Sequence, residues 1–355
     1  MSPLAAPGRA AAARPAARRP RRRAATAALL VVLLVAASAA LALWRAGSGP
    51  DERRSGLPWV SGGSDDGGIA AFERWRGRPA DVRVTWNSAD TWAVAQETYG
   101  LREAREQGED RLLSYAVPLV SEEPGQTLAT CAAGGNDERY RAMARGFVEN
   151  GFEDAIVRPG WEGSASWYPW GVSAERNGGG SDVERAERDF RECFRRFAAV
   201  FRDTAPDVRI ELNYGSGGGT TNIADVYPGD EFVDIVANDV YLPAEVRSAA
   251  DWDALCSRGT AERPQGLCRY AEFARAHGKQ LAVPEWGVDR TNAPDADAVA
   301  YVEGMARFFR ENSDVLAYEA YYNRTNDAAS PCEFRLDRGC NPEAAAAYLQ
   351  HFGDD

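Results

Sequence analysis

The feature that most constrains the fold is a regular alternation between short apolar runs and longer amphipathic stretches. Eight runs have the length and composition of strands, and they are residues 59–62, 82–87, 112–120, 155–162, 208–214, 233–241, 280–288 and 315–323. Segments with helical periodicity lie between them, at 69–75, 91–107, 138–150, 183–204, 267–277 and 298–312. Alternating strands and helices form a parallel sheet with crossover helices. Eight such units predict an α/β fold, a closed (β/α)8 TIM barrel.

Two glycine-rich segments test the main alternative, an open sheet that binds a nucleotide. No G-x-G-x-x-G follows the first strand, and the segments at 178–180 and 215–219 lack the Gly-Lys-Ser/Thr of a phosphate-binding loop. We therefore interpret both segments as loops and favour the closed barrel.

The amino-terminal part differs in composition from the rest. Residues 1–23 are basic and are expected to stay in the cytoplasm, and residues 24–44 are uncharged and long enough to cross a bilayer. Small residues at 37–39 and 40–42 also provide cleavage sites, so a transmembrane anchor and a cleaved signal peptide both remain open. A polar linker at 45–57 precedes a single predicted domain at 58–355.

All six cysteines lie beyond the apolar segment, in the part predicted to be exported, which favours disulfides. Six cysteines allow 15 pairings. Closeness in sequence suggests Cys256 with Cys268 and Cys332 with Cys340, which leaves Cys131 with Cys193. Zinc is the competing interpretation, but no two cysteines form a C-x-x-C pair and the chain has only 2 histidines, so we expect no metal.

The charge of the chain argues against nucleic acid as a partner. The net charge is −12 although the first 50 residues contain arginines and no acidic residue, so the predicted domain is strongly acidic. Phosphate binding needs clustered cations. We expect a monomer that is extracellular or anchored to the cell membrane with its domain outside, and that contacts the membrane only through the amino-terminal segment.

Two carboxylates occupy equivalent places in the predicted barrel. Glu162 ends the fourth strand and Glu285 ends the seventh, and the carboxyl ends of barrel strands meet at one mouth, where active sites lie. Hydrolysis of a glycosidic bond requires one carboxyl group that protonates the leaving oxygen and one that acts beneath the anomeric carbon. We predict Glu162 as acid/base and Glu285 as nucleophile. The alternative for either residue is half of a surface ion pair.

Aromatic and polar residues surround both glutamates in the sequence. Sugar rings stack on aromatic side chains, while polar neighbours bind their hydroxyl groups. Tyr241 could donate to the nucleophile and hold it ionised. For each aromatic the alternative is a role in the core. The predicted substrate-binding residues are Arg158, Trp161, Trp167, Tyr168, Trp170, Asn213, Asp239, Tyr241, Trp286 and Tyr322.

Three motifs in fixed order resemble a known family. They are Arg158-Pro159 followed by Glu162 and Trp167-Tyr168-Pro169-Trp170, then Tyr227-Pro228-Gly229-Asp230 followed by Asp239-Val240-Tyr241, and last Pro284-Glu285-Trp286-Gly287. Over residues 58–352 the chain resembles the retaining β-glycanases of glycoside hydrolase family 26, a mannanase-type branch of the barrel enzymes. The resemblance implies a β-mannanase-like endo-hydrolase that needs no cofactor, with Glu162 as acid/base and Glu285 as nucleophile.

One departure from the family's pattern affects the substrate. The family places a histidine before the acid/base glutamate and Asn-Gly after it, whereas this chain has Trp161 before and residues 163–165 are Gly-Ser-Ala. The preceding residue normally helps to hold the sugar, so the resemblance leaves the polysaccharide open. Two other hypotheses also remain: a barrel that binds polysaccharide without cutting it, and a different hydrolase on the same barrel.

Overall fold

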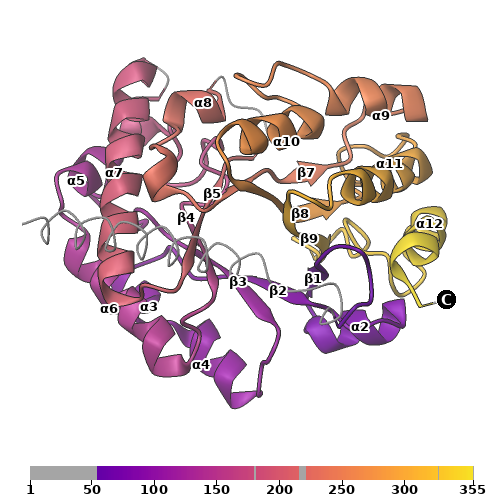
Figure 1. The fold of residues 1–355 in the computed structure, drawn as a ribbon, viewed down its shortest axis with the longest axis horizontal. Coiled ribbons are helices and arrows are strands. Elements are labelled where there is room, and N and C mark those ends of the chain that lie inside the picture. The colour runs from indigo at the N-terminus through magenta and orange to yellow at the C-terminus, as the bar shows by residue number, and fades with distance from the viewer. Residues whose placement is uncertain (1–53, 180, 216–220, 327, 355) are drawn as a thin grey trace, which may run out of the picture. The chain divides into compact units, whose positions relative to one another are not determined.

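The central sheet of the protein closes on itself. In the computed structural model, which describes residues 54–179, 181–215, 221–326 and 328–354, the strand order is β6-β5-β4-β3-β2-β1-β9-β8-β7, and β6 also pairs with β8. The short β7 follows β6 and pairs with the end of β8, so the two act as one barrel strand. Every one of these pairings is parallel, and the predicted eight-stranded TIM barrel is confirmed (Figure 1).

The strands lie close to the predicted positions. Their bounds are β1 (Ser61–Asp65), β2 (Val82–Trp86), β3 (Leu112–Val117), β4 (Ile156–Pro159), β5 (Arg209–Asn213), β6 (Ile235–Ala237), β7 (Val240–Tyr241), β8 (Gln280–Gly287) and β9 (Leu316–Asn323). The first strand differs most, since it begins at Ser61 rather than at Trp59. Trp59 lies before the strand, buried, with its indole donating to Glu319 at 3.3 Å.

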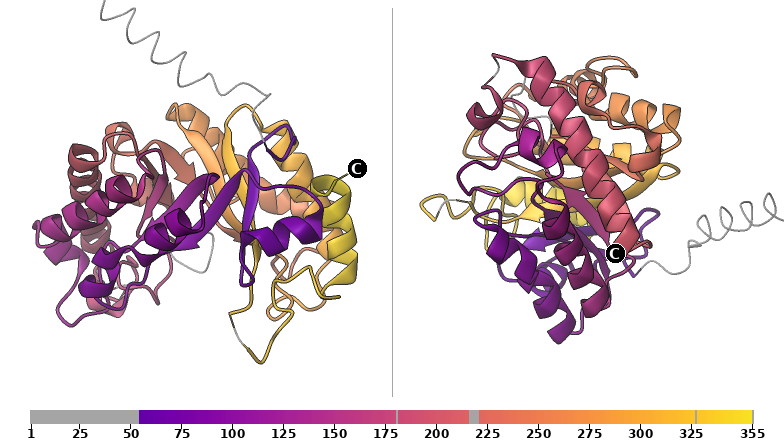
Figure 2. Two further views of the ribbon diagram at one scale, coloured as in Figure 1. Left: turned by 90° about the horizontal axis from the view of Figure 1, so that it is seen from below. Right: turned by 90° about the vertical axis from the view of Figure 1, so that its left-hand side faces the viewer.

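Helices surround the barrel, as both views in Figure 2 show. Their bounds are α2 (Ile69–Arg76), α3 (Trp92–Glu97), α4 (Tyr99–Glu106), α5 (Leu128–Ala132), α6 (Asp137–Asn150), α7 (Val183–Thr204), α8 (Ile223–Val226), α9 (Ala249–Cys256), α10 (Leu267–Ala276), α11 (Ala298–Glu311) and α12 (Pro342–Phe352), with short 3-10 turns η2 (Glu175–Asn177) and η3 (Asp230–Phe232). The predicted helix at 91–107 is two helices, because Thr98 adopts a left-handed conformation with φ 46°. The short α5, α8 and α9, together with α12, were not predicted.

The amino-terminal predictions fall largely outside the described residues. The basic segment 1–23, the apolar segment 24–44 and most of the linker 45–57 lie there. The last linker residues belong to the folded domain, since Ser55 is buried and donates to Asp81 at 2.5 Å. In the part of the chain that the structure describes, no helix is both long and apolar enough to span a membrane.

The interior of the barrel changes from apolar to polar along the strands. Side chains alternate between the two faces of a strand, so every second residue faces inward. In β4, Ile156 belongs to an apolar cluster with residues of β2, β6, β8 and β9, whereas Arg158, two residues later, is charged and fully buried. In β5 the same alternation brings Glu211 and Asn213 inward. Polar groups therefore gather toward the carboxyl ends of the strands, where active sites of this fold lie.

Strand β8 contains one extra residue. Val283 pairs with Glu319 and Trp286 with Tyr321, so three steps along β8 match two along β9. Pro284 lies in this irregularity, in keeping with the restriction of proline to bulges and edges. The extra residue changes the phase of the alternation. Glu285 therefore faces the barrel interior, while Trp286 packs outward against Phe309 and Phe352.

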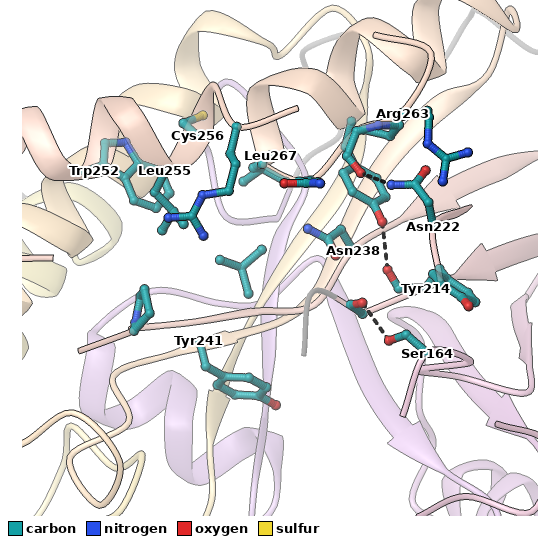
Figure 3. Close-up of a pocket in the computed structure, with 18 of the residues that line it drawn as sticks. Ser164, Tyr214, Asn222, Asn238, Tyr241, Trp252, Leu255, Cys256, Arg263 and Leu267 are labelled. Atoms are coloured by element: carbon teal, nitrogen blue, oxygen red, sulfur yellow. Dashed lines mark hydrogen bonds between the residues drawn. The ribbon is translucent and has the colours of Figure 1, made fainter. Parts of the chain in front are cut away.

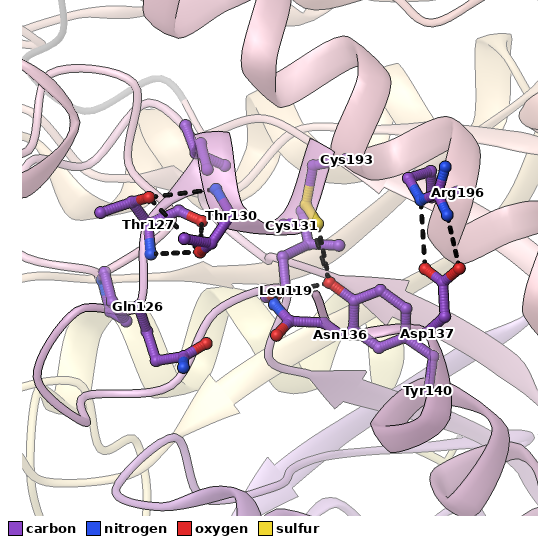
Figure 4. The surroundings of a disulfide bond; sticks show 12 residues. Leu119, Gln126, Thr127, Thr130, Cys131, Asn136, Asp137, Tyr140, Cys193 and Arg196 are labelled. Carbon is purple, nitrogen blue, oxygen red and sulfur yellow. Dashed lines mark hydrogen bonds and ion pairs between the residues drawn. A yellow bond between two sulfur atoms is a disulfide. The ribbon is translucent and has the colours of Figure 1, made fainter. Parts of the chain in front are cut away.

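The three predicted disulfides are confirmed as Cys131–Cys193, Cys256–Cys268 and Cys332–Cys340. Cys256, which Figure 3 labels, ends α9 and is bonded to Cys268 in the first turn of α10. Cys131 of α5 is bonded to Cys193 of α7 (Figure 4). Two short helices on the surface are thus linked covalently to longer ones.

We expect the Cys131–Cys193 bond to contribute most to stability. It closes a sequence separation of 62 residues, against 8 for Cys332–Cys340. The entropy that a crosslink removes from the unfolded chain grows with loop length, which gives about 4 kcal/mol for the long loop and about 2.5 kcal/mol for the short one. Urea unfolding of Cys131→Ala/Cys193→Ala and of Cys332→Ala/Cys340→Ala measures both losses. A larger loss for the second variant would contradict this ranking.

Candidate active site

An open cavity of about 890 Å³ lies at the carboxyl ends of the strands, and we call it the cleft. Both predicted carboxylates line it, Glu162 from the loop after β4 and Glu285 from β8. Its volume is within the range of small-molecule sites in proteins. The fold therefore brings together two glutamates that are far apart in the sequence.

Glu285 is surrounded by hydrogen-bond donors. The residue is only 5% exposed. Its Oε1 accepts from the indole of Trp86 at 2.9 Å and from Arg158 at 3.0 Å, and its Oε2 accepts from the hydroxyl of Tyr241 at 2.9 Å. Three donors from β2, β4 and β7 thus fix the carboxylate in one orientation and stabilise its negative charge.

Arg158 supplies the countercharge within the barrel. It is fully buried, 3.0 Å from Glu285. Burial by itself would lower the pKa of Arg158, but the negative charge of Glu285, together with Tyr318, Glu211 and Asp239, raises it instead. A buried cation that remains charged is maintained only where such partners surround it. Arg158 thus stays positive next to the carboxylate of Glu285.

Glu162 is positioned by the backbone of its loop and not by a regular strand. β4 ends at Pro159, and Glu162 adopts a left-handed conformation with φ 49°, which is uncommon for a residue other than glycine. Its backbone N–H donates to the side-chain oxygen of Asn213 at 2.9 Å. Asn213, buried at the end of β5, therefore holds the loop that carries this carboxyl group over the cleft.

The environments of Glu162 and Asp239, the two acids beside Glu285, favour their neutral forms. Burial, and then the negative charge of Glu285, raise the pKa of Glu162 to about 8, against an opposing effect of Arg158 and of a hydrogen bond from Tyr168. Burial and the charges of Glu285 and Glu162 also raise the pKa of Asp239. The cleft thus holds one anchored anion and, next to it, a carboxyl group that is protonated near neutral pH.

Aromatic rings form one wall of the cleft. Tyr168 stacks on Trp170 with ring centroids 4.8 Å apart, and both rings contact Trp161. Trp170 is completely buried and its indole donates to the backbone oxygen of Trp161 at 2.7 Å. Trp167 extends from this group and is 67% exposed. An exposed indole at the edge of a polar cavity suits stacking on a sugar ring.

The predicted site residues divide into two groups. Those that line the cleft are Trp161, Glu162, Trp167, Tyr168, Asp239, Tyr241, Glu285 and Tyr322. The other four lie behind its wall and are buried: Arg158, Trp170, Asn213 and Trp286. Arg158 and Asn213 act on the two glutamates directly, whereas Trp286 donates to Glu319 at 2.6 Å in the layer between barrel and helices.

Several residues of the cleft were not predicted. The most informative is Trp86, which ends β2 and donates to Glu285. The same reasoning that selected aromatics at strand ends would have found it. The others come from the loops after β7, β8 and β9, namely Leu242, Pro243, Asp289, Asn292, Arg324, Asn326, Glu333 and Phe334. Loop residues carry no strand pattern, so no sequence signal identified them.

Among the residues described here, no three His, Cys, Asp or Glu side chains are grouped so that they could hold a metal ion.

A closed barrel with a carboxyl group at the ends of its fourth and seventh strands, next to an aromatic wall, has the arrangement of a glycoside hydrolase. Comparison with known proteins agrees. The model of Glycosyl hydrolase family 26 matches residues 149–280, a range that includes Glu162 and ends at the first residue of β8. The predicted resemblance to this family is confirmed.

One curated relative extends the similarity over most of the chain. Endoglucanase H of Acetivibrio thermocellus is 23% identical over 305 residues, which cover 83% of this chain. The chain spans only 30% of the length of that relative.

Solved structures share the barrel at low sequence identity. The GH26C protein of a Muricauda species superimposes with a TM-score of 0.58 at 13% identity, covering 82% of this chain and 84% of that protein. The mannanase man26 of Bacillus subtilis gives 0.55 at 14% identity, with 85% and 87% covered. The GH26 β-mannanase of Bacteroides ovatus gives 0.55 at 16% identity, with 84% and 89% covered. These similarities establish the fold.

Proposed function

We propose that this chain is an exported retaining endo-β-glycanase of family 26, which hydrolyses a β-linked polysaccharide of mannan type or a related kind by double displacement. The observation that carries the proposal is the contrast between the two glutamates of the cleft. Three donors anchor Glu285 as an anion, while burial and the charge of Glu285 raise the pKa of Glu162 to about 8. Two carboxyl groups whose environments differ in this way suit the roles of nucleophile and acid.

In the first step Glu285 attacks the anomeric carbon as Glu162 protonates the departing oxygen. The bond from the sugar to that oxygen breaks, and a covalent glycosyl-enzyme forms. In the second step Glu162, now ionised, removes a proton from water, which displaces Glu285 and retains the configuration of the sugar. Arg158 and Tyr241 support the charge that returns to Glu285.

The rate is expected to depend on pH in a way that reports the pKa of Glu162. Because that pKa is raised to about 8, the acid keeps its proton below pH 8 and loses it above. The rate constant kcat/KM on a polysaccharide should therefore fall above about pH 8. A profile measured from pH 4 to 10 tests this. A rate that stays level through pH 9 would contradict the assignment of Glu162 as the acid.

Two features of the chain support a polymeric substrate outside the cell. The cleft is open and its aromatic wall ends in an exposed Trp167, as binding of an extended glycan requires. The three disulfides accord with an oxidising compartment. The names of the structural neighbours, two of which are mannanases, favour mannan among the candidate polysaccharides.

A substrate screen tests the proposal directly. The full-length chain and its Glu285→Gln variant are incubated with β-mannans, β-glucans, xylans and bacterial exopolysaccharides, and the release of reducing ends is measured. We expect release by the wild type alone, with the β-anomer as the first product in proton NMR spectra. Initial release of the α-anomer would exclude retention. A glycan that binds both proteins and stays intact would favour a binding barrel instead.

A further inference from the structure

A second cavity, of about 420 Å³, lies beside the cleft, and we call it the side chamber (Figure 3). Tyr241 and Pro243 line both cavities, so the two share a wall at the end of β7. Trp252, Cys256 and Leu267, from α9 and α10, line its opposite side. The Cys256–Cys268 bond links these two helices. The side chamber is thus bounded by a crosslinked helix pair.

The side chamber lies on the side of the cleft that carries Glu162. Ser164, two residues after Glu162, lines it and donates to the backbone oxygen of Gly215 at 2.7 Å. Gly215 also lines it, and a Cβ built on this glycine would lie 3.5 Å from Cγ of Glu162. An acid/base residue protonates the leaving oxygen, so this is the side toward which the leaving part of the glycan extends.

Asn238, which lines the side chamber, has a side-chain oxygen that accepts no hydrogen bond from the described residues. Asn238 is 1% exposed, and no donor from the described residues reaches its Oδ1. The hydroxyl of Tyr270 already donates to the backbone oxygen of Tyr214 at 3.1 Å. A buried acceptor without a donor costs about 1–3 kcal/mol of stability. A ligand that brings its own donor would supply the missing hydrogen bond.

The surroundings of Asn238 favour an uncharged ligand. The buried side chains of Val240 and Leu267 form apolar walls. Two arginines line the chamber at exposed positions, and both are paired: Arg258 with Glu245 at 3.3 Å, and Arg263 with Asp225 at 2.6 Å. A sugar unit, with hydroxyl donors and apolar C–H faces, fits this combination of groups.

We propose that the side chamber binds one uncharged sugar unit, carried as a branch on the leaving-group side of the scissile bond, with a hydroxyl that donates to Asn238. This inference rests on the proposed glycanase function. A branch fits better than the main chain, because the side chamber, with about 420 Å³, has less than half the volume of the cleft, with about 890 Å³. The main chain would run through the open cleft, and the chamber would select glycans with single-sugar branches.

Binding of free hexoses tests the chamber independently of hydrolysis. The probes are mannose, galactose and glucose, with glucuronate as the charged counterpart, added to the full-length Glu285→Gln chain with labelled Leu and Val methyl groups. We expect at least one hexose to shift the signals of Val240 and Leu267, and glucuronate to leave them unchanged. Asn238→Leu should weaken the binding about tenfold, because it removes the acceptor.

A second variant keeps the test valid if Asn238→Leu does not fold. Leu255→Trp enlarges a half-buried residue of the chamber and should abolish hexose binding, whereas the control Leu349→Trp, on the exposed face of α12, should not. Absence of any hexose shift in the parent chain, or binding that survives Leu255→Trp, would overturn the inference.

Measurements of hydrolysis distinguish a failure of this inference from a failure of the proposed function. On paired linear and singly branched oligosaccharides of a glycan that the enzyme cuts, Leu255→Trp should lower the branched-to-linear ratio of kcat/KM about tenfold. If glycans are cleaved but the variant leaves the branched-to-linear ratio unchanged, the glycanase function stands and the inference about the side chamber is refuted. If hexoses bind to the side chamber but no glycan is cleaved, the inference about the side chamber stands and the glycanase function is refuted.

Discussion

Glu285→Gln is expected to reduce kcat on the polysaccharide by about 10⁴- to 10⁶-fold, the range found when an enzyme loses its nucleophile. The amide has nearly the size of the carboxylate and keeps an oxygen for two of the three donors, Trp86 and Arg158, which share one oxygen of Glu285. It cannot attack the anomeric carbon, because it carries no negative charge. Release of reducing ends under saturating substrate measures the loss.

Glutamine is a better choice than alanine for this test because Arg158 is buried 3.0 Å from the carboxylate. Removal of one partner of a buried pair typically costs about 3–5 kcal/mol, so alanine would combine a catalytic defect with partial unfolding. The matched control is Glu343→Gln at an exposed position in the first turn of α12. Residual activity of Glu285→Gln within tenfold of this control would exclude Glu285 as the nucleophile.

Glu162→Gln is expected to slow the hydrolysis of substrates whose leaving group needs a proton much more than that of substrates whose leaving group does not. On the polysaccharide, whose leaving alcohol needs a proton, kcat/KM should fall about 10²- to 10⁴-fold. On a 2,4-dinitrophenyl glycoside, whose leaving group departs without a proton, kcat/KM should fall less than tenfold. The second step then lacks its base, so dinitrophenolate should appear in a burst followed by slow turnover.

The pH profile of this variant provides an internal control. The fall in rate above about pH 8 is attributed to Glu162, and it should disappear in Glu162→Gln measured with the dinitrophenyl substrate. Equal losses on both substrates, with the fall at alkaline pH retained, would assign the acid to another group. Asp239, whose pKa is also raised by burial, would be the first alternative.

The barrel and the two glutamates were predictable because both depend on local patterns. Each strand is a short apolar run, and parallel strands in a barrel bring their carboxyl ends together wherever the helices between them pack. Glu162 and Glu285 follow such runs directly, so their shared position followed from the order of elements. The disulfides were predictable for a similar reason, since two of the three close short loops.

The hydrogen bonds that position Glu162 and Glu285 come from residues that are distant from them in the sequence. Trp86 reaches Glu285 across 199 positions, and Asn213 reaches the backbone of Glu162 across 51. No periodicity links such residues, because their meeting depends on the closure of the barrel. The side chamber, lined by residues of β7, α9 and α10 and by Asn238 between β6 and β7, could likewise not be predicted from the sequence, since Asn238 resembles any polar residue at a strand end.

The extra residue in β8 has a consequence for the transfer of this site to other proteins. In an unbroken strand Glu285 would share the outward direction of Val283, and Trp286 would turn inward. A protein engineer who placed a glutamate at the matching position of a regular barrel would therefore direct it into the helical layer. To keep the glutamate facing inward, the engineer would have to transfer the backbone of Pro284, Glu285 and Trp286 together. A search for related sites should look for the extra residue in the strand as well as for the glutamate.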